Sequence, residues 1–276
     1  MRVWFITGAS RGFGALVTQA ALADGDAVVA TARDPAAVTR RLGVHPNLLP
    51  VALDVTDEAQ AHEAVGQALK RFGRIDVLLN NAGYGLLGGV EESSGPEVER
   101  LFRTNVFGLL AVTRAVLPAM RRQRAGHVIN ISSIGGYAAY PGWGVYCATK
   151  FAVEALTEAL AAELAPIGIK ATVVEPGFFR TDFLDDQSLA KTEARIADYA
   201  DTVGATRAFA GGANHAQPGD PAKLAAAILA LVAAPRPPLR LPLGSDTVAR
   251  IEEKNRFVAD ELAPWRALAL STDFAA

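Results

Sequence analysis

Short apolar runs alternate with longer helix-period runs along most of the chain, and this alternation restricts the fold more than any other feature. The apolar runs that we expect to be strands are residues 3–6, 28–31, 48–53, 77–79, 128–131, 171–174 and 239–243. In these runs consecutive rather than alternate positions are apolar, which is typical of strands that are covered on both faces. The pattern therefore predicts an α/β fold, a doubly wound domain of about seven parallel strands with helices on both faces.

The expected helices fill the intervals between these strands. They are residues 13–22, 35–42, 58–72, 95–124, 144–164, 221–234 and 247–262. Asp34 is the expected N-cap of the helix that begins at Pro35, and Asn105, a poor helix former, is expected to mark a break in the long fourth helix. Because no repeat or linker interrupts the pattern, we expect residues 1–276 to form one domain, with a C-terminal helical extension at 247–276.

The composition excludes several classes of function. The 276 residues carry 27 basic and 29 acidic side chains, so the basic surface of a nucleic-acid-binding protein is not expected. The single cysteine, Cys147, and four scattered histidines predict neither a disulfide nor a metal site. The longest apolar run, residues 224–234, is 11 residues long, whereas a membrane span needs about 20. With no signal-peptide pattern at the N-terminus, the expected location is cytoplasmic, without a membrane partner.

A glycine-rich turn follows the first expected strand and leads into the first expected helix. In an open α/β sheet a dinucleotide binds at this turn, because glycines let the backbone approach a pyrophosphate and the helix N-terminus offers free N–H groups. The spacing is G-x-x-x-G-x-G, not the commoner G-x-G-x-x-G, so the turn alone would also fit an ordinary strand-to-helix connection. The expected dinucleotide contacts are Gly8, Ser10, Arg11, Gly12, Phe13 and Gly14.

The end of the second expected strand indicates which dinucleotide binds. An acidic residue there would bind the ribose 2′-hydroxyl of NAD, but the chain has Ala32 followed by Arg33. Arg33 and Arg11 suit a 2′-phosphate, because guanidinium groups bind phosphate with two hydrogen bonds. The alternative is that Arg33 is a solvated surface residue. We expect NADP(H) as the cofactor.

Tyr146 and Lys150 are four residues apart on an expected helix, so they share one face. A neighbouring ammonium group favours the phenolate form of tyrosine, which suits proton transfer. The pair alone would equally fit a core tyrosine beside a surface lysine. However, the stretches 80–83, 130–133 and 175–181 each follow an expected strand, so they meet the pair at the carboxyl edge of the sheet. Asn105 is either part of this group or the N-cap of a helix after a kink.

These motifs, in this order, resemble the short-chain dehydrogenase/reductase family, which has a Rossmann-type fold, over residues 3–243. The resemblance implies that Tyr146 is the general acid/base and that Lys150 binds the nicotinamide ribose and tunes Tyr146. It further implies that Ser133 holds the substrate oxygen and that Asn105 holds a water in a proton relay to Lys150. The expected cofactor contacts that follow from it are Asp54, Val55, Asn81, Ala82, Gly83, Tyr146, Lys150, Pro176, Gly177 and Thr181.

Within the family, the chain looks most like the NADP-preferring branch of 17β-hydroxysteroid dehydrogenase-type enzymes and carbonyl reductases. This likeness implies an NADPH-dependent oxidoreductase that interconverts a ketone or aldehyde and its alcohol by hydride transfer. A dinucleotide-binding sensor on the same fold is the rival hypothesis, but a sensor has no need of the proton-transfer residues. The family usually pairs through helices near 106–120 and 151–164, so a homodimer is expected.

The substrate pocket is the part of the site that the sequence defines least. The candidate lining residues, which would equally fit core packing, are Tyr84, Tyr140, Trp143, Phe178 and Phe179. Residues 182–219 lack a clear pattern and predict either a mobile lid over the substrate or a fixed loop. Phe183, Leu184, Tyr199 and Phe209 are the apolar side chains expected to close over a ligand. Asp182, Asp185 and Asp186 would repel an anion, so the expected substrate is neutral and apolar.

Overall fold

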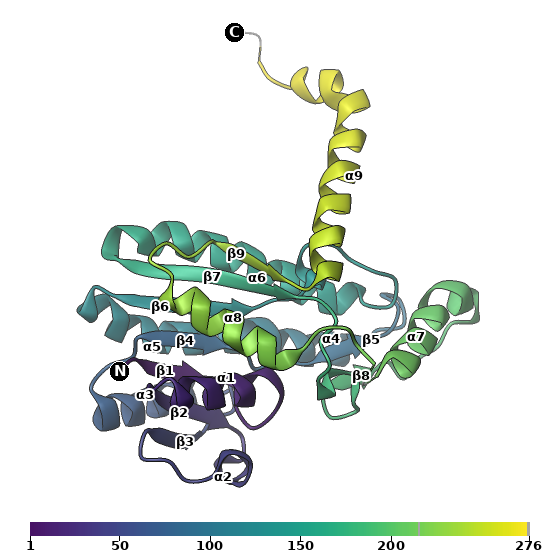
Figure 1. Ribbon diagram of the computed structural model, residues 1–276. Helices are drawn as coiled ribbons and strands as arrows, with labels where there is room; N and C mark the ends of the chain where they lie inside the picture. The colour runs from purple at the N-terminus through teal and green to yellow at the C-terminus, as the bar shows by residue number, and fades with distance from the viewer. Residues whose placement is uncertain (215, 275–276) are drawn as a thin grey trace.

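Seven parallel strands form the central sheet, as the sequence predicts (Figure 1). In the computed structural model, which describes residues 1–214 and 216–274, they lie in the order β3-β2-β1-β4-β6-β7-β9. Their bounds are β1 (Val3–Ile6), β2 (Ala27–Ala32), β3 (Leu48–Ala52), β4 (Val77–Asn80), β6 (Gly126–Ile131), β7 (Ile169–Pro176) and β9 (Arg240–Leu243). Every neighbouring pair is parallel.

The strand order reverses between β1 and β4. The chain first builds outward from β1 through β2 to β3, and then returns to place β4 on the other side of β1. At such a switch point the loops that leave the two strands diverge, and a crevice opens at the carboxyl ends of the strands. The topology therefore puts the glycine-rich turn after β1 and the loop after β4 on either side of one crevice.

Helices cover both faces of the sheet (Figure 1). Their bounds are α1 (Gly12–Ala23), α2 (Pro35–Leu42), α3 (Glu58–Phe72), α4 (Gly95–Phe102), α5 (Leu109–Gln123), α6 (Gly144–Leu164), α7 (Ala205–Ala213), α8 (Pro221–Ala233) and α9 (Ser245–Leu270). Trp4 and Ile6 of β1 are buried in the core that includes α1 and α8, whereas Phe5 is buried in the core that includes α3 and α5. Successive side chains of β1 thus enter different cores, which explains why the whole strand is apolar.

The predicted helix at 95–124 is three segments: α4, a π-helical turn over Arg103–Gly108, and α5. The break near Asn105 is confirmed, and Asn105 lies inside the π-helical turn. The alternative that Asn105 is an N-cap is wrong, since Gly108 occupies the N-cap position of α5. A Cβ atom on Gly108 would lie 2.7 Å from Val55 Cγ2, so glycine lets the turn approach the segment after β3.

The structure also contains elements that the sequence pattern does not predict. β5 (Gly85–Leu87) and β8 (Leu189–Lys191) form a separate two-stranded parallel sheet, and α7 follows β8. Residues 182–219 therefore contain regular structure rather than a bare loop. Residue 215 of this segment lies outside the described residues, as do residues 275–276 of the predicted C-terminal extension.

The last helix, α9, projects from the body of the molecule (Figure 1). It continues eight residues past its predicted end at 262, through Pro264, to Leu270. All residues from Arg256 to Leu270 are exposed, whereas Thr247 in the first turn is buried. In the described part of the chain, no helix has the length and apolar character to cross a membrane.

Candidate active site

A cavity of about 790 Å³ lies at the carboxyl edge of the sheet. The residues that the sequence assigns to the cofactor, the substrate or catalysis line it, except Gly14, Asn105, Tyr199 and Phe209. The cavity is continuous from the glycine-rich turn to Tyr146. Its further lining residues, which belong to no predicted site, include Arg100, Arg103, Ser132, Cys147 and Gln187. Of these, Arg100 and Arg103 reach the cavity from α4 and the π-helical turn, and no sequence motif marks them.

The glycine-rich turn has the shape that a pyrophosphate needs. Gly8 and Gly12 have φ angles of 66° and 53°, a backbone region that side chains with a Cβ rarely adopt. A Cβ atom on Gly14 would lie 2.5 Å from the carbonyl oxygen of Gly8, so Gly14 packs the helix against the turn instead of lining the cavity. At its N-terminus, α1 has no capping side chain and no acidic residue in its first turn. These features fit an anionic dinucleotide.

Asn81 joins this turn to the end of β4. Its side-chain amide donates hydrogen bonds to the carbonyl oxygens of Thr7 (2.9 Å) and Gly8 (3.1 Å). The Thr7 hydroxyl in turn accepts hydrogen bonds from the backbone N–H groups of Asn81 and Ala82. Asn81 therefore holds the floor of the dinucleotide crevice in place.

At the end of β2, Arg33 lies exposed on the wall of the cavity. Neither a hydrogen bond nor an ion pair joins it to another of the described residues. Its neighbour Asp34 caps α2, accepting from the N–H of Ala36 at 3.0 Å, and pairs with Arg40 at 2.7 Å. The hydrogen bond from Arg40 holds the pKa of Asp34 below its usual value. The predicted N-cap role of Asp34 is confirmed. The carboxyl group of Asp34, which would otherwise compete for the ribose of the dinucleotide, is therefore engaged within the protein.

Arg11 is bound by a residue of another segment instead of standing free beside Arg33. Its guanidinium donates to the side-chain oxygen and to the backbone carbonyl of Gln187, both at 2.7 Å. This contact links the glycine-rich turn to residues 182–219, and Arg11 and Gln187 both line the cavity.

The catalytic candidates lie together at the inner end of the cavity. Tyr146 and Lys150 are each only 7% exposed, and Lys150 Nζ lies 5.8 Å from the centre of the Tyr146 ring. Lys150 Nζ donates a hydrogen bond of 2.9 Å to the carbonyl oxygen of Ile131, at the end of β6. Ser133 Oγ accepts from the N–H of Gly135 at 3.0 Å, which leaves its own hydrogen free to donate.

Burial sets the charge of these groups. It raises the pKa of Tyr146 far above the usual phenol value, and a hydrogen bond with Ser133 opposes the rise. Tyr146 is therefore neutral at pH 7. Burial lowers the pKa of Lys150 to about 8, while the carboxylate of Glu154 acts in the opposite direction.

Asn105 lies behind these residues and does not line the cavity. Its side-chain amide donates to the carbonyl oxygen of Tyr84 (2.9 Å) and to Thr149 Oγ1 (3.2 Å). Its Oδ1 accepts from the N–H of Tyr84 at 3.1 Å. A Cβ atom on Gly83 would lie 3.1 Å from Asn105 Oδ1 and 3.8 Å from Lys150 Nζ, so the two groups flank the same glycine. Asn105 thus fixes the loop after β4 against the catalytic helix.

The five aromatic residues predicted for the substrate pocket, at positions 84, 140, 143, 178 and 179, all line the cavity, but they pack differently. Trp143 contacts Tyr146 edge-on, with ring centres 5.7 Å apart. Phe183, from residues 182–219, also contacts Tyr146, with ring centres 5.7 Å apart. Phe179 packs on Phe13 at 5.6 Å and belongs partly to the core of the sheet. Tyr146 therefore contacts two aromatic rings, those of Trp143 and Phe183.

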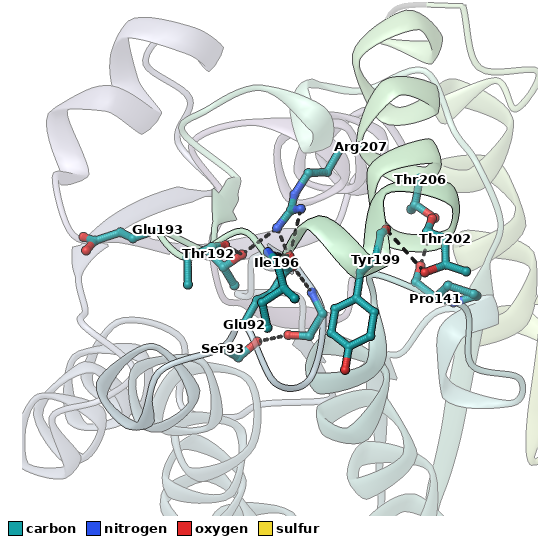
Figure 2. Close-up of polar contacts among 12 residues, drawn as sticks. Glu92, Ser93, Pro141, Thr192, Glu193, Ile196, Tyr199, Thr202, Thr206 and Arg207 are labelled. Carbon is teal, nitrogen blue, oxygen red and sulfur yellow. Dashed lines mark hydrogen bonds and ion pairs between the residues drawn. The ribbon is translucent and has the colours of Figure 1, made fainter.

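Residues 182–219 are fastened to the body by polar contacts (Figure 2). Glu92, only 2% exposed, accepts hydrogen bonds from Arg207, including one of 2.6 Å, and from the N–H of Ile196 at 2.8 Å. The Arg207 hydrogen bonds hold the pKa of Glu92 at about 2, so the pair is charged at neutral pH. Thr206 donates to the carbonyl oxygen of Pro141 at 3.0 Å. Residues 182–219 can therefore move away from the body only if the buried ion pair between Arg207 and Glu92 breaks.

Only part of this segment reaches the cavity. Phe183 and Leu184 line it, as predicted. Tyr199 and Phe209 do not: Tyr199 donates to the carboxylate of Glu91, and Phe209 packs against Phe178 with ring centres 5.8 Å apart. For these two residues, closure over a ligand stays a prediction, since neither lines the cavity in this structure.

A family model described as short chain dehydrogenase matches residues 2–192. The chain belongs to the short-chain dehydrogenase/reductase family. Oxidoreductase BOA17 of Botryotinia fuckeliana is 38% identical to this dehydrogenase/reductase over 273 residues, covering 98% of this chain and 99% of the relative. The 3-ketodihydrosphingosine reductase of Bacteroides thetaiotaomicron is 40% identical, covering 88% of each chain.

Solved structures confirm the fold of this short-chain dehydrogenase/reductase. The crystal structure of a short-chain dehydrogenase from Streptomyces avermitilis superimposes with a TM-score of 0.91 at 42% identity, covering 99% of this chain and 100% of that one. A short-chain dehydrogenase/reductase from Burkholderia phymatum, solved in complex with NAD, has a TM-score of 0.83 at 26% identity, covering 94% and 95% of the two chains. The protein is thus an oxidoreductase of a family that binds nicotinamide cofactors. Within residues 1–214 and 216–274, no cluster of His, Cys, Asp and Glu is arranged to hold a metal ion.

Proposed function

We propose that this protein is an NADPH-dependent carbonyl reductase that converts a neutral, largely apolar ketone or aldehyde to its alcohol. The observation that carries the proposal is the neutral, buried Tyr146 beside Ser133 at the inner end of the dinucleotide cavity. A tyrosine that keeps its proton at pH 7 is suited to donate it to an oxygen that gains negative charge. Reduction of a carbonyl generates such an oxygen.

Three side chains divide the proton chemistry. Tyr146 gives its phenolic proton to the substrate oxygen, and Ser133 donates a hydrogen bond to the same oxygen. The Lys150 ammonium group then offsets the charge of the Tyr146 phenolate. The bound dinucleotide supplies the hydride. Asn105 is proposed to hold a water that returns a proton through Lys150, which its position beside Gly83 allows.

The cofactor preference rests on the end of β2. Arg33 is exposed on the cavity wall, and Asp34 is engaged by Arg40 and by its own helix. A 2′-phosphate at this position would meet a free guanidinium rather than a carboxylate. The contacts proposed for the rest of the dinucleotide are the glycine-rich turn, Asp54 and Val55 at the adenine, and Thr181 at the carboxamide.

The substrate class rests on the lining of the cavity. Tyr84, Tyr140, Trp143, Phe178 and Phe183 supply aromatic surface, and Asp182 would disfavour an anion. The name of the Bacteroides relative, 3-ketodihydrosphingosine reductase, describes the reduction of a ketone. A dinucleotide sensor is the alternative function, but the buried pair of Tyr146 and Lys150 would then have no use.

A screen of carbonyl compounds tests the proposal, with the oxidation of NADPH as the readout. The panel pairs neutral apolar ketones and aldehydes with carboxylate-bearing analogues of similar size. Turnover of the neutral members supports the proposal. A preference for the carboxylates would contradict the neutral-substrate claim, and no turnover of any compound would favour the sensor.

Residues 182–219 are proposed to close over the substrate. Phe183 already packs on Tyr146, and Gln187 is held by Arg11 of the glycine-rich turn. Hydrogen exchange with NADPH and a slowly reduced ketone should therefore show greater protection of this segment than the free protein. Exchange in α3, none of whose residues line the cavity, serves as the internal control. Equal protection of 182–219 in both states would establish a fixed loop.

A homodimer is proposed through the outer faces of α5 and α6. On the π-helical turn before α5, Phe107 is 60% exposed, and on α6 Phe151 is 44% exposed. Ala155, Ala159 and Ala162 on the same face of α6 would let two helices approach closely. Light scattering should give about twice the chain mass of 29.0 kDa, and Ala159→Arg should shift it to the monomer. A monomer mass across micromolar concentrations would contradict this interface.

A further inference from the structure

We propose that Glu154 and Glu175 hold one proton between them directly behind the catalytic lysine, and that Glu154 is a positioning residue that sets the charge of Lys150. The second half of this inference rests on the proposed reductase function, whereas the first half does not. It assigns a role to buried groups that lie outside the dinucleotide cavity.

Glu154 lies on α6, four residues after Lys150, so the two side chains share one face of the helix. Glu154 is 4% exposed. A Cβ atom on Gly136 would lie 2.8 Å from Glu154 Oε1 and 2.3 Å from Ser132 Oγ, so the carboxyl group and the serine hydroxyl occupy the same narrow space. Ser132 also lines the cavity, whereas Glu154 does not.

The guanidinium group of Arg240 donates hydrogen bonds to three carboxyl groups beside Glu154's position on α6, that of Glu154 included. Arg240 of β9 donates through Nη1 to Glu154 and to Glu175, the latter at 2.8 Å, and through Nη2 to Glu158. Glu175 of β7 is fully buried, whereas the Glu158 side chain is 52% exposed. The remaining ionisable neighbour is Tyr137, whose ring stacks under Arg240 at 5.6 Å. The two buried carboxyl groups thus share the one guanidinium of Arg240, and Lys150 on the same face of α6 is a second cation near Glu154.

Two adjacent buried carboxyl groups at one guanidinium do not both ionise readily, because each charge raises the cost of the other. In the described structure, Glu154 Oε1 and Glu175 Oε2 are buried without a hydrogen-bond partner. A proton on either carboxyl group removes the charge repulsion between Glu154 and Glu175. It also supplies a hydrogen-bond donor next to the two oxygen atoms that lack a partner. Burial and the neighbouring Glu175 carboxylate agree with this, since they raise the pKa of Glu154 to about 7.

The charge of Glu154 affects catalysis through the pKa of Lys150. Burial lowers the pKa of Lys150 to about 8, and an ionised Glu154 raises it. When Glu154 releases its proton, the Lys150 ammonium is retained more firmly, and it can offset the Tyr146 phenolate. Loss of the carboxylate removes a negative charge and must lower the pKa of both Lys150 and Tyr146.

The shared proton can be observed without any enzyme activity. Infrared difference spectra between about pH 6 and pH 8 should show the carbonyl stretch of a buried, protonated carboxylic acid, because these values lie on either side of the Glu154 pKa of about 7. Glu154→Gln should abolish this band. Glu175→Gln should abolish it as well, because Glu154 then ionises against Arg240 alone. Glu158→Gln, at the exposed carboxyl group of the same arginine, should keep it. A band that is missing from the parent protein or unchanged in Glu154→Gln would overturn the shared proton.

The positioning role is tested by the pH profile of kcat. The reductase rate should fall as pH rises through the apparent pKa of the Tyr146–Lys150 pair, and in Glu154→Gln this fall should occur about one pH unit lower. The KM for the ketone should change less than about twofold, since Glu154 touches no substrate. Glu158→Gln should keep the parent profile. An unshifted profile in Glu154→Gln, with the infrared band lost, would overturn the positioning role alone, and a parent protein without reductase activity would overturn both this role and the proposed function.

Discussion

Tyr146→Phe should lower kcat for carbonyl reduction by at least about 100-fold, because it removes the phenolic proton beside Ser133 while keeping the ring. Trp143 and Phe183 contact the ring of Tyr146 rather than the hydroxyl, so the pocket should keep its shape. NADPH binding should be retained. Steady-state kinetics combined with fluorescence titration of NADPH measures both effects.

Tyr137→Phe is the matched control for this variant. Tyr137 does not line the cavity, and its hydroxyl donates to Asn255 of α9. Its loss should leave kcat within about twofold of the parent value. Lys150→Ala should reduce both kcat and NADPH affinity, since Lys150 serves the ribose as well as Tyr146. If Tyr146→Phe keeps most of the activity, another group donates the proton.

Arg33→Ala should weaken NADPH binding by about 10- to 100-fold, because a hydrogen bond to a charged phosphate contributes about 1.5–3 kcal/mol. NADH lacks the 2′-phosphate, so its affinity should barely change. Arg41→Ala is the matched control, since Arg41 lies exposed on α2 and does not line the cavity. Isothermal titration of the parent and the two variants with both cofactors gives the affinities. Equal affinity of the parent protein for NADPH and NADH would contradict the assignment of Arg33.

Much of the central fold could be predicted because its signals are local. The strands of the sheet are apolar at consecutive positions, and the helix starts at Pro35 and Glu58 follow from the preceding aspartates. β5 and β8 could not be predicted, since each has three residues and is defined by its partner about a hundred residues away. The true end of α9 was missed because the helix runs through Pro264, a residue that usually ends one.

The candidate site likewise has parts that local sequence motifs predict and parts that depend on contacts between distant segments. The glycine-rich turn and the Tyr146–Lys150 pair are short motifs, and their positions after strands bring them to one cavity. The bond between Arg11 and Gln187 and the cluster around Arg240 depend on contacts between distant segments. Nothing near Glu154 in the sequence marks it as buried beside a second carboxyl group, because helix α6 alone does not show what β7 and β9 place against it.

The exposed helix α9 carries one of the tryptophans of the chain, Trp265. The chain has three tryptophans, and their surroundings differ: Trp4 is fully buried in the sheet, Trp143 is 9% exposed beside Tyr146, and Trp265 is 63% exposed on the distal part of α9. Each indole therefore reports on a different event, namely global unfolding, occupancy of the cavity, and fraying of the projecting helix. Replacing Trp265 with phenylalanine would leave an emission signal that follows the body of the molecule alone, without the contribution of a helix that can open on its own.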